Sequence, residues 1–156
     1  MTFRISGLDP EPFAPLFDLP DAELAARGMR RRFADEPVGF PCRVSLDDAA
    51  VGDELVLLAY EHHAVSSPYR GSGPIYVRRA ARAAWAGVDR VPPALLRRTQ
   101  LSVRAYDAAG LMVTAAFVDG AALADRLPRL LEDPAVAYAH VHYGKTGCFA
   151  ARVDRA

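Results

Sequence analysis

The sequence is short of cysteine and of long apolar runs, and each shortage excludes a class of protein. The two cysteines, Cys42 and Cys148, are too few and too far apart for the disulfide framework of a small secreted domain. Residues 1–7 lack the apolar stretch of a signal peptide, and no apolar run is long enough to span a bilayer. We therefore expect a cytoplasmic protein with reduced thiols and no membrane partner.

Net charge is absent too, because 19 basic residues balance 19 acidic ones. A neutral chain has no overall field to attract a polyanion, so we expect no nucleic-acid partner. Lys145 is the only lysine, and arginine supplies the other positive charges. We attribute that preference first to codon usage, so a single arginine is weak evidence for a binding site.

The remaining composition is that of an ordinary globular domain. Hydrophobic residues make up 51% of the chain and charged residues 24%. The length suits one domain over residues 1–156, without repeats or linkers. Short alternating segments outnumber helical ones and do not alternate regularly with them. This pattern predicts an α+β fold with a mostly antiparallel or mixed sheet, which can curl into a partial barrel.

We expect about eight short strands and two or three short helices. The predicted strands cover residues 3–7, 41–46, 54–60, 75–78, 101–106 and 111–118, with a closing hairpin within 135–155. The predicted helical segments cover residues 19–27, 80–85, 94–98 and 121–131. The four prolines within residues 8–20 exclude a regular element there, so this segment should wrap over the surface and pack by Phe13, Leu16 and Phe17.

The closing hairpin carries two of the four histidines and one of the two cysteines. Side chains alternate between the faces of a strand, and the apolar rows of both strands should share one core. Residues 144–146 form one fitting loop, which sets His142 opposite Cys148. This register places His140, His142 and Cys148 together on one face and turns Phe149 into the core.

His140 and His142 therefore make a candidate site with three alternatives open. They can bind a transition metal with a third ligand from Cys148, His62, His63 or Glu61, act as catalytic or ligand-binding groups without a metal, or be structural. We assign no metal. Arg104 and Tyr106 share one face of their strand, and they extend the same polar surface if that strand neighbours the hairpin.

The loop around Tyr69, Arg70 and Ser72 is the second candidate. Its glycines allow backbone amides to form an anion-binding nest, and Arg70 can hold a carboxylate or phosphate. A tight loop between strands needs glycines anyway. Cys42 and Cys148 are candidate nucleophiles, since Arg43 and His142 can lower a neighbouring thiol pKa. Inert buried cysteine is the alternative.

Several short motifs, taken in order, resemble a bacterial family known as domain of unknown function 1203. They are Pro41-Cys42-Arg43, Ser67-Pro68-Tyr69-Arg70, Gly73-Pro74-Ile75-Tyr76-Val77-Arg78, Arg104-Ala105-Tyr106-Asp107, His140-Val141 and Gly147-Cys148-Phe149. The resemblance spans nearly the whole chain and implies a single domain without a known activity. An arginine is usual in the family at His142, which argues against a shared metal ligand there.

Two functions remain open. In the first, a small enzyme or binding domain accepts a small anionic ligand, held by arginine beside a histidine that moves a proton. In the second, a non-catalytic interaction or assembly domain, including a homo-oligomer, uses Tyr69, Tyr76, Tyr138 and Arg70. The sequence names no cofactor, reaction or substrate.

Overall fold

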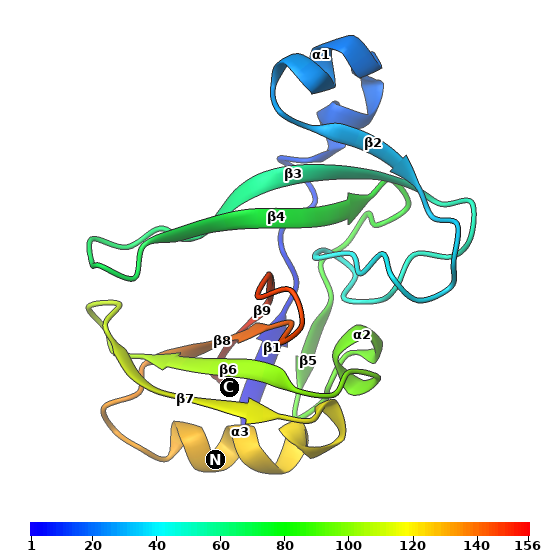
Figure 1. The fold of residues 1–156 in the computed structure, drawn as a ribbon. Helices are drawn as coiled ribbons and strands as arrows, with labels where there is room; N and C mark the ends of the chain where they lie inside the picture. The colour runs from blue at the N-terminus through cyan, green and yellow to red at the C-terminus, as the bar shows by residue number, and fades with distance from the viewer.

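Nine short strands form two separate sheets in the computed structural model, which describes residues 1–156 (Figure 1). The large sheet has the order β5-β1-β9-β8-β6-β7, and the small sheet has the order β2-β3-β4. Neighbouring strands are antiparallel throughout, and the sheets do not close into a barrel. The predicted α+β class is therefore confirmed.

The elements are short throughout. The strands are β1 (Phe3–Ser6), β2 (Arg30–Phe33), β3 (Glu54–His63), β4 (Gly71–Arg78), β5 (Ala86–Val88), β6 (Leu101–Tyr106), β7 (Met112–Val118), β8 (Tyr138–His142) and β9 (Phe149–Arg155). The helices are α1 (Asp21–Ala26), α2 (Pro93–Leu96) and α3 (Leu123–Leu131), with 3-10 turns η1 (Ala14–Asp18) and η2 (Gly120–Ala122).

One apolar core lies between the large sheet and α3. Leu123, Leu127 and Leu131 recur every four residues, so they share one side of the helix, and all three are fully buried. Figure 1 shows α3 beneath the face of the large sheet that is turned away from β3 and β4. The helix continues through Pro128 without a break.

A second apolar core lies on the small sheet. Phe13, Leu16 and Phe17 pack against Val56 and other strand residues, as the proline-rich segment predicted. Each sheet thus covers one face with its own apolar layer. Polar residues of β3 and β8 occupy the space where the two sheets face each other, and the site is built there.

Two predicted elements are wrong. The segment 41–46 makes only isolated bridges and turns at Leu46, whose φ is +50° and whose amide donates to Cys42. Residues 80–85 are not helical despite their alanines. Trp85 instead exchanges backbone hydrogen bonds with Val44 and Gly7, so distant partners replace the local helical ones.

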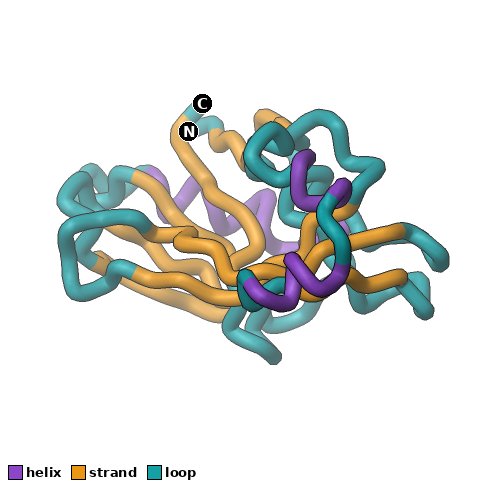
Figure 2. The backbone as a smooth tube through the Cα atoms, turned by 90° about the horizontal axis from the view of Figure 1, so that it is seen from above, coloured by secondary structure: helices purple, strands orange, loops and turns teal.

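Two further strands, β2 and β5, were not predicted. Arg30, Arg31 and Arg32 lie in β2 at the edge of the small sheet, and Arg31 forms ion pairs with Asp21 and Glu54. The chain ends lie side by side, because β1 pairs with β9 (Figure 2). No helix has the length and apolar character needed to cross a membrane.

Candidate functional site

A β-bulge in the closing hairpin decides which side chains face the site. Val141 pairs with Ala151 but His142 pairs with Phe149, so β9 contains one extra residue, Ala150. Both alanines point into the core, and the ring of Phe149 moves to the histidine face.

The predicted neighbourhood of His142 and Cys148 is therefore wrong. Cys148 lies one step beyond Phe149, and its carbonyl accepts a hydrogen bond from the amide of Tyr143 at 2.9 Å. Because side chains alternate, Cys148 shares the side of Tyr143 and not that of His142. The prediction assumed regular alternation along both strands, and the extra residue in β9 shifts that alternation by one position.

A second bulge brings His62 and His63 to the same place. Tyr60 pairs with Gly73 and His63 with Gly71, so β3 has one extra residue between these pairs. The ring centroids of His62 and His142 are 5.2 Å apart. Those of His63 and His140 are 5.0 Å apart. All four histidines of the chain thus meet between the sheets, and we call them the histidine cluster.

Backbone carbonyls fix two of these rings. Nδ1 of His142 lies 2.9 Å from the carbonyl oxygen of Gly147, which can only accept, so we assign the proton to Nδ1. Nε2 of neutral His142 then carries a free lone pair. Nδ1 of His63 lies 2.8 Å from the carbonyl of Tyr69 in the same way, so Nε2 accepts from the hydroxyl of Tyr138.

Burial disfavours the charged form of His62, His140 and His142. It lowers the pKa of His140 to about 2 and the pKa of His142 to about 4. It also lowers the pKa of His62, with a further contribution from His63. Three buried ring nitrogens have no hydrogen-bond partner: Nδ1 of His62, Nδ1 of His140 and Nε2 of His142. Such unpaired nitrogens are uncommon inside proteins, and each is open to a hydrogen bond from a bound ligand.

The strand β6 supplies the next residues of this face. Arg104 pairs with His140, and Tyr106 pairs with Tyr138, so the expected neighbourhood of this strand and the hairpin is confirmed. Arg104 contacts the hydroxyl of Ser102 at 3.4 Å and forms no ion pair. No group of three or more histidine, cysteine or acidic side chains is arranged to hold a metal ion.

The Tyr69–Ser72 region does not form the expected nest. Residues 71–74 belong to extended β4, where successive amides alternate in direction. Arg70 is exposed and forms a two-point ion pair with Glu61, at 2.9 Å for each contact. The carbonyl of Tyr69 bonds to His63 and its ring lies edge-on to Tyr106, while Ser72 is exposed at the start of β4.

The two cysteines lie in different environments. Cys42 is buried in the second core, and its sulfur accepts a hydrogen bond from the amide of Arg78 at 3.4 Å. Cys148 is partly exposed and lines a cavity of about 710 Å³ between the sheets. The walls of this inter-sheet cavity are Leu57, Pro74 and Tyr76 of the small sheet, the turn residues 143–146 and 148, and the arginines Arg43, Arg97 and Arg98, among others.

Arg43 is the unusual group in the inter-sheet cavity. Only 3% of its surface is exposed, and its guanidinium donates to the carbonyls of Phe149 at 2.8 Å and Pro41 at 2.6 Å. It also lies over the ring of Tyr143, 5.1 Å from the centroid. No carboxylate pairs with it, whereas Arg98 forms a two-point ion pair with Asp48. Burial lowers the pKa of Arg43, because the charged guanidinium is removed from water. A buried cation normally needs a counter-ion.

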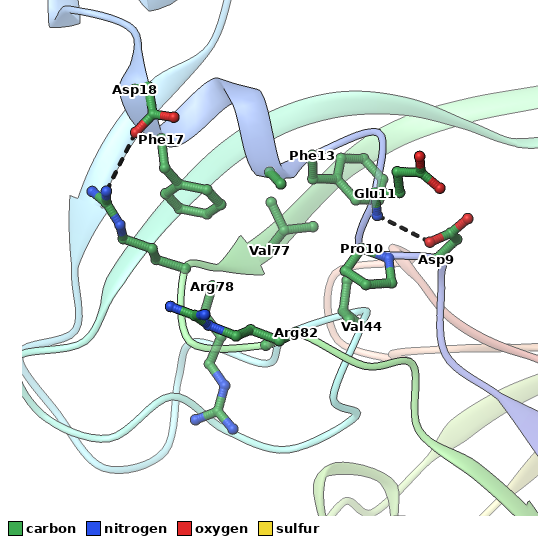
Figure 3. Close-up of a pocket in the computed structure, with 13 residues that line it drawn as sticks. Asp9, Pro10, Glu11, Phe13, Phe17, Asp18, Val44, Val77, Arg78 and Arg82 are labelled. Atoms are coloured by element: carbon green, nitrogen blue, oxygen red, sulfur yellow. Dashed lines mark hydrogen bonds and ion pairs between the residues drawn. The ribbon is translucent and has the colours of Figure 1, made fainter.

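A second cavity, of about 520 Å³, lies beside the proline-rich segment (Figure 3). Phe13, Phe17 and Val77 line it, and Figure 3 shows Asp18 at its margin. Asp18 forms an ion pair with Arg79. Its acidic residues are all exposed, as is Arg82. Exposed charges are stable in water without a ligand, so this cavity lacks the unmatched charge that distinguishes Arg43.

A family model described as "Protein of unknown function (DUF1203)" matches residues 39–155. The matched range contains Arg43, Cys148 and the whole histidine cluster, and it excludes the proline-rich segment of the second cavity. No curated protein matches the chain. No solved structure matches it either.

Proposed function

Because this chain belongs to the DUF1203 family, whose description assigns no activity, we propose from its own geometry that it binds a small organic anion in the inter-sheet cavity. Arg43 is the counter-ion of that ligand. The observation that carries the proposal is a guanidinium 3% exposed, at the wall of a cavity, without a carboxylate partner. A bound carboxylate or phosphate would supply the missing negative charge.

The remaining walls suit such a ligand. A volume of about 710 Å³ lies within the range of small-molecule sites, roughly 300–1,000 Å³. Lys145 is exposed at the turn and forms no ion pair, so its ammonium is available at the entrance. Tyr76 and Leu57 offer apolar surface to the rest of the molecule.

The histidine cluster extends the same proposal beyond the cavity. The carbonyl of Phe149 accepts from Arg43, while its ring stacks on His62 with centroids 5.2 Å apart. One residue therefore joins the cavity to the cluster. A ligand that reached past this ring would meet Nε2 of His142, a neutral nitrogen whose lone pair can accept a hydrogen bond from the ligand.

Calorimetric titration with small anions tests the proposal. The panel contains mono- and dicarboxylates, phosphate monoesters and inorganic phosphate, and the proteins are wild type, Arg43→Lys, Lys145→Ala and Arg126→Ala. Arg126 lies exposed on α3, across the large sheet from the cavity, and serves as the control. We expect Arg43→Lys to weaken binding by roughly tenfold or more, because lysine lacks the two-point fork.

Lys145→Ala should weaken binding severalfold, and Arg126→Ala should bind like wild type. Lys145 is exposed, so its variant tests the cavity even if Arg43→Lys fails to fold. The proposal is wrong if no anion of the panel binds wild type, or if Lys145→Ala and Arg126→Ala bind equally well.

The alternative function, an interaction domain, was predicted to use a surface of tyrosines and Arg70, and these residues are largely buried or paired. Tyr138 is only 7% exposed and Tyr76 lines the inter-sheet cavity, while Arg70 is paired with Glu61. These residues do not form one exposed patch with Tyr69. An assembly function would have to use another part of the molecule.

A further inference from the structure

The free edge of the large sheet is the strand β7, Met112–Val118. It pairs with β6 on one side and with no strand on the other. Such an edge presents a row of backbone N–H and C=O groups that a further strand can bind. Natural proteins usually protect these edges with charge, proline, short length or a covering segment.

The other three edges of this protein carry such protection. The strand β2 contains Arg30, Arg31 and Arg32, and β5 has only three residues. The strand β4 contains Pro74, and Cys42 bridges to it at Tyr76. The seven residues of β7 include neither a charge nor a proline, and its β-bulge at Val113 leaves residues 114–118 regular.

The exposed side chains of β7 are apolar except for that of Thr114. Phe117 is 73% exposed and Val113 is 37% exposed, and Val118 is the only buried residue of the strand. Phe117 pairs with Ser102 and Ala115 with Arg104, so both lie on the face that carries the histidines. An exposed phenylalanine on an edge without charge or proline is a feature that proteins normally avoid unless a partner covers it.

We propose that β7 pairs antiparallel with β7 of a second copy of this chain, joining the two large sheets into one across a two-fold axis. A strand without charge meets its own copy without electrostatic repulsion, and antiparallel pairing of identical strands satisfies two-fold symmetry. The charged, short or blocked edges of the same chain are poorer partners.

An axis at Ala116 keeps the new pairs within residues 114–118, the regular part of β7. Ala115 then lies opposite Phe117 of the partner subunit, and the same pair recurs on the other side of the axis. Side chains directly opposite each other stabilise antiparallel strands, and here each phenylalanine packs on an alanine. The interface goes beyond the proposed anion site, because neither Arg43 nor the inter-sheet cavity contributes to it.

Sedimentation equilibrium across the micromolar range tests the inference on wild type, Phe117→Lys, Ala115→Lys and Phe33→Lys. Phe33 is the matched control, since it is 60% exposed on the edge strand β2. We expect a wild-type dimer, and the lysines in β7 should raise its dissociation constant roughly a hundredfold, because two apolar contacts are lost and two like charges meet. Phe33→Lys should leave the dimer intact.

Two results would overturn the inference. One is a wild-type chain that stays monomeric up to the highest concentration. The other is a dimer that persists in both β7 variants, which would place the interface elsewhere. Phe117 and Ala115 are exposed, so circular dichroism should show folded variants and leave the masses interpretable.

Discussion

The hydroxyl of Tyr138 donates a hydrogen bond to Nε2 of His63 at 2.7 Å, and this bond joins the large sheet to the small one. Nδ1 of His63 is satisfied by the carbonyl of Tyr69. His63 therefore has both ring nitrogens paired, unlike the three other histidines of the cluster. We assign His63 a structural role, and only its three neighbours keep a ring nitrogen for a ligand.

Tyr138→Phe should lower the free energy of unfolding by about 1–3 kcal/mol, because Nε2 of His63 would remain buried without a partner. Urea unfolding monitored by circular dichroism measures the change. Tyr69→Phe is the control, since His63 contacts its carbonyl and the side chain is half exposed. Equal stability of Tyr138→Phe and wild type would show that the bond contributes nothing.

The free energy of unfolding should fall as the pH is lowered from about 7 to about 5. His140 and His142 have pKa values of about 2 and about 4 in the folded state, against 6.5 for an ordinary histidine. Below 6.5 the unfolded chain binds protons that the folded chain rejects, so acid favours unfolding. Each of the two histidines should lower the free energy of unfolding by about 2 kcal/mol at pH 5 relative to pH 7.

Urea titrations at a series of pH values check this slope. The lowered pKa of His62 acts in the same direction. The pKa of Asp48 is also lowered, from 3.8, so its loss of stability comes only at more acid pH. In His142→Gln the fall over the same interval should shrink by about 2 kcal/mol. A flat profile for wild type would contradict the buried neutral cluster.

Asp48→Asn should destabilise the fold by about 3 kcal/mol or more. The carboxylate has 1% of its side chain exposed and binds Arg98 at 2.6 and 3.0 Å. Removing its charge leaves the partly buried guanidinium of Arg98 without a counter-ion. Asp154→Asn serves as the control, because the pair of Asp154 and Arg152 is exposed and should be worth less than about 1 kcal/mol. Chemical denaturation of both variants makes the comparison.

The turn of the closing hairpin offers a pair of glycines for a fourth test. A Cβ at Gly144 would lie 1.7 Å from the carbonyl oxygen of Gln100, so alanine there must displace backbone. Gly147 has a φ of +75° and open space around it. We expect Gly147→Ala to cost about 1 kcal/mol and Gly144→Ala more than about 2 kcal/mol. Thermal unfolding measures both variants, and a larger destabilisation by Gly147→Ala than by Gly144→Ala would contradict this expectation.

Local sequence patterns predicted the elements whose hydrogen bonds and packing involve residues close in the chain. The hairpin of β6 and β7 and the helix α3 were predicted because a turn or a repeat of leucines determines them within a few residues. The buried stretch of β3 followed from its apolar run. In contrast, residues 80–85 have good helix formers but bond to the distant Val44 and Gly7, which no local pattern reveals.

The candidate site was only partly predictable. His140, His142 and Arg104 share a face because alternation in a strand is a local rule. Cys148 was misplaced because the bulge at Ala150 has no sequence signature. Arg43 was noted only as a neighbour of Cys42, since its contact with Phe149 spans 106 residues. The adjacent histidines at the end of β3 were the available signal for the full cluster.

The two sheets are held by apolar clusters of 18 and 10 buried residues, each anchored by helices or loops on its own side. Neither cluster depends on the side chains of the histidine cluster or on Lys145 and Thr146 at the cavity turn. Apart from His63, which bonds to Tyr138 across the two sheets, natural drift or laboratory selection can therefore exchange the groups in the middle layer and retain the scaffold. The same architecture is in that sense a frame for recognising other molecules, with new specificity arising from a few substitutions.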